Sequence, residues 1–305
     1  MRSWLVTVCL LSALLPASAG LLSLAHAAND PRKPLPLPAR DRHEQLLRWL
    51  ELNPAPAPES VAAEEPELLN RPALIQTLAP QLVIIIDDIG NNRAQGERSA
   101  HLPGPLSLAV LPFTPHSTHL ATLGHKTGKE IMLHVPMENH QHLPLGPGAL
   151  TLSMDRAGFT EQLLASINSV PHVRGVNNHM GSLMTEQTQQ MEWTMAVLQT
   201  RGLFFVDSRT SADTVGASTA QARGVPHLSR QVFLDHDRDP EAIAAAFNKG
   251  IRIARQTGIA ILIGHPYPET LDLLERRLPL LEAEGIVLVS AGQLLGQQSI
   301  AHKSP

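Results

Sequence analysis

Cysteine, aromatic residues and dense runs of positive charge are all scarce in this sequence of 305 residues. The one cysteine, Cys9, lies close to the N-terminus, so the rest of the chain can offer no disulfide, thiol nucleophile or thiolate ligand. The formal net charge is -4, and no basic run is present to neutralise phosphates. Nucleic acid is therefore not an expected partner, and any metal site must use His, Asp, Glu or Asn.

The hydrophobic content is ample although aromatic side chains are few. Hydrophobic residues make up 43% of the chain and aromatic residues only 3%. We therefore expect an interior built from Leu, Ile, Val and Ala, which is typical of barrels and of doubly wound α/β sheets.

The N-terminus has the features of a signal peptide, expected over residues 1–27. Arg2 precedes an apolar stretch at residues 4–15, and small residues suit cleavage after Ala19 or Ala27. We expect an exported protein of the periplasm or cell envelope. An uncleaved N-terminal anchor is the alternative interpretation.

Residues 28–79 are rich in Pro, Ala and Glu and are predicted to be a spacer. One short helix fits within it at residues 46–52, after the capping-capable Asp41. That helix is a candidate contact for an envelope protein partner or for the domain that follows. The expected domain covers residues 80–296, and residues 297–305 form a tail.

From residue 81, short apolar runs alternate with longer amphipathic stretches, which is typical of β/α units around parallel strands. The predicted strands are residues 82–86, 106–111, 130–133, 173–176, 203–206, 231–234, 259–263 and 286–289, and the clearest helices are residues 185–199, 240–257 and 269–284. About eight strands in this length are slightly compact for a full barrel. The prediction is an α/β fold, an irregular (β/α)7-8 barrel.

Polar residues follow six of the predicted strands. They are Asp87 and Asp88, His134 to Glu138, Asn177 to Ser182, Asp207 to Thr210, Asp235 to Asp237, and His265. In a parallel barrel these positions meet on the C-terminal face, where such folds place their sites. We therefore predict one polar site at that end.

Taken singly, most of these residues have a plain structural explanation. Asp207 and Asp235 fit equally well as N-caps of the next helix, and a lone histidine at a strand end is more often a core residue. The adjacent pair Asp87 and Asp88 is different, because two such carboxylates repel unless a cation or proton compensates. Glu138, Asn178 and Arg209 are additional candidates for the site.

A divalent ion such as Zn²⁺ needs about three imidazole or carboxylate ligands and an open position. Asp88, His134 and His179 can supply these ligands from three strands. Asp87 is then placed to take a proton from a metal-bound water, and His265 to give one to a leaving group. The pattern predicts metal-assisted hydrolysis of an acyl bond.

Five spaced motifs also resemble a known family. They are residues 84–90 (IIIDDIG), 134–138 (HVPME), 178–182 (NHMGS), 207–210 (DSRT) and 263–266 (IGHP). They are similar to those of the divergent polysaccharide deacetylase family, relatives of the NodB-homology carbohydrate esterases in the glycoside hydrolase/deacetylase barrel superfamily. The resemblance implies an irregular (β/α)7 barrel, with Asp87 as catalytic base, Asp88 as metal ligand, His134 on the metal-binding strand and His265 as the acid.

The sequence departs from the esterase pattern at two places. Glu138 stands where the second motif has another histidine, and residues 177–182 replace an Arg-Pro-Tyr-Gly-like motif. The third ligand is therefore His179, from its place after a strand, or Glu138.

Two functions remain in competition. One is a metal-dependent hydrolase that removes acetyl groups from N-acetylated sugars of an envelope glycan. The alternative is a catalytically weak or inactive glycan-binding or envelope-assembly protein on the same barrel. The carboxylate pair with His265 favours the enzyme, whereas the scarcity of aromatic rings for stacking on sugars favours the alternative.

Overall fold

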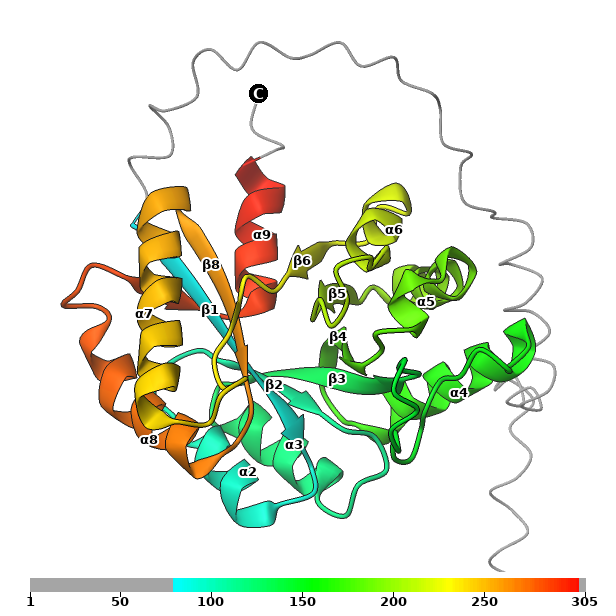
Figure 1. Ribbon diagram of the computed structural model, residues 1–305, viewed down its shortest axis with the longest axis horizontal. Helices are drawn as coiled ribbons and strands as arrows, with labels where there is room; N and C mark the ends of the chain where they lie inside the picture. Colours follow the sequence, from blue (N-terminus) through cyan, green and yellow to red (C-terminus); the bar gives the residue numbers. More distant parts are fainter. Residues whose placement is uncertain (1–78, 302–305) are drawn as a thin grey trace, which may run out of the picture. The chain divides into compact units, whose positions relative to one another are not determined.

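The computed structural model describes residues 79–301, which contain a nine-stranded parallel sheet and its surrounding helices (Figure 1). The strands are β1 (Gln81–Ile89), β2 (Ser107–Val110), β3 (Glu130–Met137), β4 (Val173–Met180), β5 (Phe204–Asp207), β6 (His227–Ser229), β7 (Val232–Phe233), β8 (Ile259–Gly264) and β9 (Val287–Val289). The α-helices are α2 (Arg93–Ala100), α3 (Ser117–Lys126), α4 (Arg156–Ser169), α5 (Thr188–Arg201), α6 (Gly216–Ala222), α7 (Pro240–Thr257), α8 (Pro268–Arg277) and α9 (Ala291–Ala301). Two 3₁₀ turns, η2 (Met184–Glu186) and η3 (Leu278–Leu280), complete the set.

Local sequence signals set the ends of the helices. The carboxylate of Asp239 accepts hydrogen bonds from the backbone N–H groups of Glu241 and Ala242, and Pro240 occupies the first turn of α7. The same helix ends at Thr257 and is capped by Gly258, whose φ of 88° is accessible to glycine at little cost. The prediction of a helix at residues 240–257 is therefore confirmed.

Other predicted elements differ at their ends for identifiable reasons. The helix predicted at residues 269–284 ends at Arg277, because Pro279 follows and cannot continue the hydrogen-bond pattern. The helix predicted at residues 185–199 begins at Thr188, after the turn η2. All eight predicted strands are present, whereas β6, a strand of three residues, was not predicted.

The strands lie in the order β6-β5-β4-β3-β2-β1-β8-β7, and β9 also pairs with β1. Within the described residues β6 and β7 do not pair, and the chain crosses between them without a helix. The backbone N–H of Arg230 donates to Asp207 on β5, and that of Gln231 donates to Ile261 on β8. The predicted irregular (β/α) barrel is confirmed, with its irregularity at this crossing.

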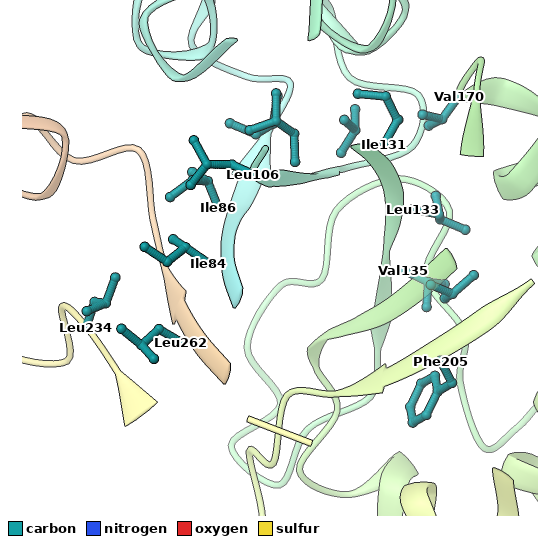
Figure 2. Packing of buried hydrophobic residues seen from close by; sticks show 14 of the residues in the cluster. Ile84, Ile86, Leu106, Ile131, Leu133, Val135, Val170, Phe205, Leu234 and Leu262 are labelled. Atoms are coloured by element: carbon teal, nitrogen blue, oxygen red, sulfur yellow. The ribbon is translucent and has the colours of Figure 1, made fainter. Parts of the chain in front are cut away.

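Successive side chains of a strand point to opposite sides of the sheet, which produces two hydrophobic layers. The outer layer packs under the helices and includes Ile84, Ile86, Leu133 and Leu262 (Figure 2). The inner layer contains Val83, Ile85, Ala109, Met132, Val206, Ile261 and Ile263. The inner layer is thus mainly aliphatic, as the low aromatic content predicted, and Phe204 on β5 is its one aromatic member within the described residues.

Helix α9 lies against the inner layer and contacts β1 and β6. Its residues Ala291, Leu294 and Leu295 belong to the inner hydrophobic cluster. The carboxylate of Glu130, at the start of β3, accepts hydrogen bonds from the Gly292 N–H and the Ser107 hydroxyl. This helix therefore occupies the end of the barrel where the strands begin, and it continues past residue 296 to Ala301.

The expected signal peptide and almost all of the expected spacer, with its candidate helix, lie outside the described residues. Among the described helices, none has both the length and the apolar character needed to span a membrane.

Candidate functional site

The two adjacent carboxylates at the end of β1 face the same side because the backbone turns between them. Asp87 continues the inward series of Val83 and Ile85. Regular alternation would send the next side chain outward, but Asp88 has a φ of 57°, in the left-handed region. The pairing of β1 with β2 is also irregular between Ile86 and Ile89. Both carboxylates therefore contribute to one site.

His134 and His179 reach the same site from β3 and β4. The parallel register pairs His134 with Asn177 and Pro136 with His179, so both histidines lie on the inward-facing positions of their strands. Their rings meet edge to face, with centroids 4.9 Å apart. His134 is buried, whereas His179 is partly exposed at the mouth of the barrel.

Asp88, His134 and His179 form a cluster of three potential ligands, called here the ligand cluster. Asp88 Oδ1 lies 2.9 Å from His179 Nδ1 and 3.3 Å from His134 Nε2, and the two nitrogens are 3.2 Å apart. Within residues 79–301 the buried Oδ1 of Asp88 has no hydrogen-bond partner of good geometry. Three polar atoms therefore converge on a point that no group of the protein fills.

These separations fit a divalent cation. Ligand atoms about 2.0–2.1 Å from a common ion, at angles between those of octahedral and tetrahedral coordination, lie about 2.9–3.4 Å from one another. Two imidazole nitrogens with one carboxylate oxygen are also a donor set that suits Zn²⁺ and similar ions. Burial opposes ionisation of Asp88, yet the neighbouring imidazoles hold the pKa of this carboxyl well below its usual range. The cluster thus keeps the charged form that a cation requires.

Asn177 connects the base candidate to the ligand cluster. Its side chain is fully buried, and its Oδ1 lies 2.8 Å from His134 Nδ1. Its Nδ2 donates to Asp87 Oδ1 at 2.8 Å and lies 3.3 Å from the Ser208 hydroxyl. Because an amide oxygen only accepts, His134 Nδ1 must carry the proton, and this leaves Nε2 free to bind a cation.

Asp87 is buried beside the ligand cluster, with Oδ2 3.5 Å from His134 Nε2. Burial raises the pKa of this carboxyl above its ordinary value, although His134, His265 and the Asn177 hydrogen bond act in the opposite direction. A carboxylate with a raised pKa accepts a proton more readily than a solvated one.

His265 faces the ligand cluster from the end of β8. Its Nδ1 lies 2.9 Å from Asp235 Oδ1, and its Nε2 lies 3.8 Å from Asp88 Oδ2. The other oxygen of Asp235 accepts from the His265 backbone N–H and from the Thr270 hydroxyl. Burial by itself lowers the pKa of His265, but the Asp235 hydrogen bond and the nearby carboxylates outweigh it and raise the pKa to about 9. The ring is therefore oriented by a buried carboxylate and protonated at neutral pH.

The structure separates the remaining candidates. Glu138 lies outside the ligand cluster, and its Oε2 accepts a hydrogen bond of 2.6 Å from the Leu152 N–H. Of the two candidates for the third ligand, His179 is therefore the one that joins Asp88 and His134. Asp235 contacts the site through His265, and Arg209 lines the cavity beside the cluster.

Asp207 and Asn178 hold loops at the barrel mouth. The carboxylate of Asp207 accepts from the Arg209 N–H and the Thr214 hydroxyl, so this residue is a loop-fixing group and not a cleft residue. The side chain of the next residue, Ser208, reaches Asn177 instead, because successive side chains of an extended chain point to opposite sides. Asn178 lines the cavity and also bonds the Met180 carbonyl and the Ser208 N–H.

Sequence reasoning did not single out Asn177, Ser208, Arg230 or Tyr267, although each lies in or beside the site. Asn177 stood within a recognised strand-end motif, so its inward position was the available signal. Arg230 lies in the crossing between β6 and β7, which no sequence pattern marked.

The ligand cluster lies between two cavities of about 450 and 460 Å³. Asp88, His179 and His265 line both of them. The two cavities are therefore halves of one cleft that runs across the cluster, and an extended ligand can contact both halves at once.

Comparison with known proteins identifies the class to which this barrel and its strand-end cluster belong. Residues 84–295 match the divergent polysaccharide deacetylase family, and the chain belongs to that family. It is 36% identical over 228 residues to the uncharacterized protein YibQ of Escherichia coli strain K12, which covers 75% of this chain and 71% of YibQ. It is also 33% identical over 228 residues to an uncharacterized protein of Haemophilus influenzae strain Rd, covering 74% and 80% of the two chains.

A solved structure supports the fold independently. The crystal structure of the uncharacterized protein ATU2773 from Agrobacterium tumefaciens superimposes with a TM-score of 0.69 at 22% identity. The match covers 71% of this chain and 89% of that one.

Proposed function

We propose that this protein is a metal-dependent hydrolase that removes acetyl groups from N-acetylated sugars of an envelope glycan. The observation that carries the proposal is the ligand cluster with its unsatisfied Asp88 oxygen, flanked by Asp87 on one side and His265 on the other. Membership of the divergent polysaccharide deacetylase family supports a glycan as the substrate.

The ion proposed for the cluster is Zn²⁺, held by Asp88, His134 and His179. A divalent ion at this position would polarise the acetyl carbonyl and lower the pKa of a water molecule. Asn177 would fix the His134 tautomer that presents an unprotonated nitrogen to the ion.

The chain's own groups supply the proton transfers of amide hydrolysis. Asp87, with its raised pKa, takes the proton of the attacking water as the oxygen bonds to the carbonyl carbon. His265, protonated at neutral pH and held by Asp235, then donates its proton to the amide nitrogen as the C–N bond breaks. The products are acetate and a free amino sugar.

Metal analysis of the purified protein beside an acetate-release assay tests this proposal, with chitooligosaccharides and peptidoglycan as substrates. We expect about one bound divalent ion per chain and acetate release that a chelator abolishes. Asp87→Asn should keep the metal and lose the release. A fully loaded wild-type protein that binds these glycans without releasing acetate would refute the hydrolase and favour the inactive glycan-binding alternative.

We also propose that the protein is exported to the periplasm or cell envelope. The N-terminal stretch of the sequence supports this. N-terminal sequencing of envelope material should find a mature start near Gly20 or Ala28. An intact Met1 in the cytosolic fraction would contradict it.

A further inference from the structure

The two halves of the cleft differ in charge. The first half, called the neutral half, is lined by Asn91, Asn92, Gln95, Tyr267 and several prolines. Among its lining residues Asp88, which it shares with the ligand cluster, is the only carboxylate, and there is no Lys or Arg. The second half, called the arginine half, is lined by Arg209 and Arg230 together with Ser208, Thr210, Phe233 and His236. Its carboxylates are the buried Asp87 and the shared Asp88. A ligand that spans the cleft therefore meets amide groups at one end and two guanidinium groups at the other.

Arg230 is held rigidly and lacks an acidic partner. Its Nε donates to the Ser208 carbonyl at 2.6 Å and its Nη2 to the Arg209 carbonyl at 2.8 Å, and the guanidinium stacks on the Phe233 ring. Within residues 79–301 no carboxylate lies within 4.0 Å of it. Burial, with the positive charge of Arg209 adding to it, lowers the pKa of Arg230 although Asp87 and Asp207 oppose this. The Nη1 donors of this desolvated cation remain available to a ligand.

Arg209 supplies a second cation at the same place. Its backbone has a φ of 48°, and its N–H is fixed by the Asp207 carboxylate. Its side chain is exposed at the cavity and, in the described part of the chain, makes no ion pair.

The acids nearest to these arginines have other partners. Asp87 accepts from Asn177, Asp88 belongs to the ligand cluster, and Asp207 accepts from Arg209 N–H and Thr214. An anion from outside the chain is thus the group that would compensate the two guanidinium charges. Arginine binds carboxylates in preference to neutral hydroxyls because the fork of N–H donors matches the two oxygens.

We infer that the cleft selects an acidic glycan, in which the acetylated sugar lies at the ligand cluster and a sugar carboxylate lies between Arg209 and Arg230. This inference rests on the proposed function for the placement of the acetyl group. The carboxylate could belong to a uronic acid or to a lactyl ether substituent, since both present the same two oxygens to the guanidinium groups.

Binding titrations with three tetrasaccharides test the inference without requiring turnover. One is made of N-acetylglucosamine alone, the second alternates N-acetylglucosamine with glucuronate, and the third alternates it with N-acetylmuramate. We expect at least one acidic ligand to bind about tenfold more tightly than the neutral one at low salt, with the preference falling as salt rises. The better acidic ligand identifies the source of the carboxylate.

Arginine variants locate the effect. Arg209→Gln changes an exposed side chain, so the fold should be retained, and it should reduce the acidic-to-neutral affinity ratio about three- to tenfold. Arg230→Lys, which keeps the charge but loses the fork, should reduce the ratio as well, with thermal melting to check folding. The matched control is Arg174→Gln, an exposed arginine that lines a cavity beside Glu130 and Gly292 at the opposite end of the barrel.

The outcomes separate this inference from the proposed function. A wild-type protein that binds all three ligands equally, or an Arg209→Gln ratio that matches Arg174→Gln, would overturn the inference even if acetate is released. An acidic preference that disappears in Arg209→Gln would sustain it even if no acetate is released, and in that case only the hydrolase proposal fails.

Discussion

Removing the Asn177 amide should weaken metal binding and stability together. In Asn177→Ala, Asp87 Oδ1 loses a donor at 2.8 Å and His134 Nδ1 loses its acceptor at 2.8 Å. Both groups are buried, so neither is easily satisfied by water. A buried group left unpaired costs about 1–3 kcal/mol, and more when it is charged, so we expect a loss of about 3–5 kcal/mol in the free energy of unfolding. Loss of the partner of a ligating histidine should also lower metal affinity about 10- to 100-fold.

Asn178→Ala is the matched control for this change. Asn178 is also buried and also loses an amide, but its partners are the Met180 carbonyl, the Ser208 N–H and the Thr210 hydroxyl. We expect this variant to be destabilised while its metal affinity, measured on folded protein by chelator competition, falls less than that of Asn177→Ala. Equal losses of metal affinity in the two variants would refute a specific role of Asn177 in orienting His134.

Asn177→Asp separates the two contacts. A carboxylate at this position still accepts from His134 Nδ1, but it faces Asp87 and repels it, so the pKa of Asp87 should rise further. We expect metal affinity close to that of the wild type with reduced hydrolysis at neutral pH. If Asn177→Asp binds metal as poorly as Asn177→Ala, the acceptor role assigned to the amide oxygen is wrong.

Four further predictions follow from the same geometry. Alanine at any one position of the ligand cluster should lower metal affinity more than about 100-fold, whereas Glu138→Ala should retain metal. The metal content of the purified variants tests whether His179 or Glu138 is the third ligand. His265→Ala should lower turnover about 10²- to 10⁴-fold at unchanged metal content, and normal turnover per folded molecule would contradict its role as the acid. In the metal-free protein the folded-state pKa of His265 is raised from 6.5 to about 9, so its contribution to stability is fully present below pH 6.5 and is lost as pH rises through 9. Urea unfolding should show that the free energy of unfolding falls by about 3 kcal/mol over this range, and that His265→Gln lacks this fall. A chain that begins at residue 79 should retain cooperative melting, because β1 begins at Gln81 and the Pro80 carbonyl still accepts from Val287.

The sequence was most informative where one simple rule applies to several strands. Polar residues at the ends of parallel strands share one edge of the sheet. That rule predicted the meeting of Asp87, Asp88, His134, His179 and His265, and the structure brings all five together. It needed only the approximate ends of the strands.

The details that depend on single-residue alternation were beyond the sequence. Strand β5 has four residues, too few to show which side chains point inward. The sequence indicated Asp207 as a candidate for the site, whereas the structure shows that its neighbour Ser208 reaches Asn177. Arg230 arrives from the crossing between β6 and β7, where the chain leaves one strand partner for another. Such a position follows from how the two edges of the curled sheet face each other, which no local pattern encodes.

Backbone strain accounts for some of the polar residues at the mouth of the barrel. Asp88, Met180 and Arg209 lie within two residues of the ends of β1, β4 and β5, and they have φ values of 57°, 53° and 48°. Residues other than glycine adopt this region at a cost of about 1 kcal/mol or more each. The surrounding structure must therefore hold these turns.

Neighbouring side chains provide that support. The Met180 carbonyl accepts from the Asn178 amide and the Thr210 hydroxyl, and the Arg209 N–H donates to Asp207. The polar residues at the strand ends thus divide into those that face the cleft and those that stabilise the turns directing them there. The two kinds share residue types and positions in the sequence, because carboxylates and amides serve equally well as ligands and as partners of backbone groups. Asp207 and Asp88 illustrate the division. Each carboxylate lies in the last two residues of a buried strand, and only the hydrogen bonds to the backbone distinguish the residue that holds a turn from the one that belongs to the ligand cluster.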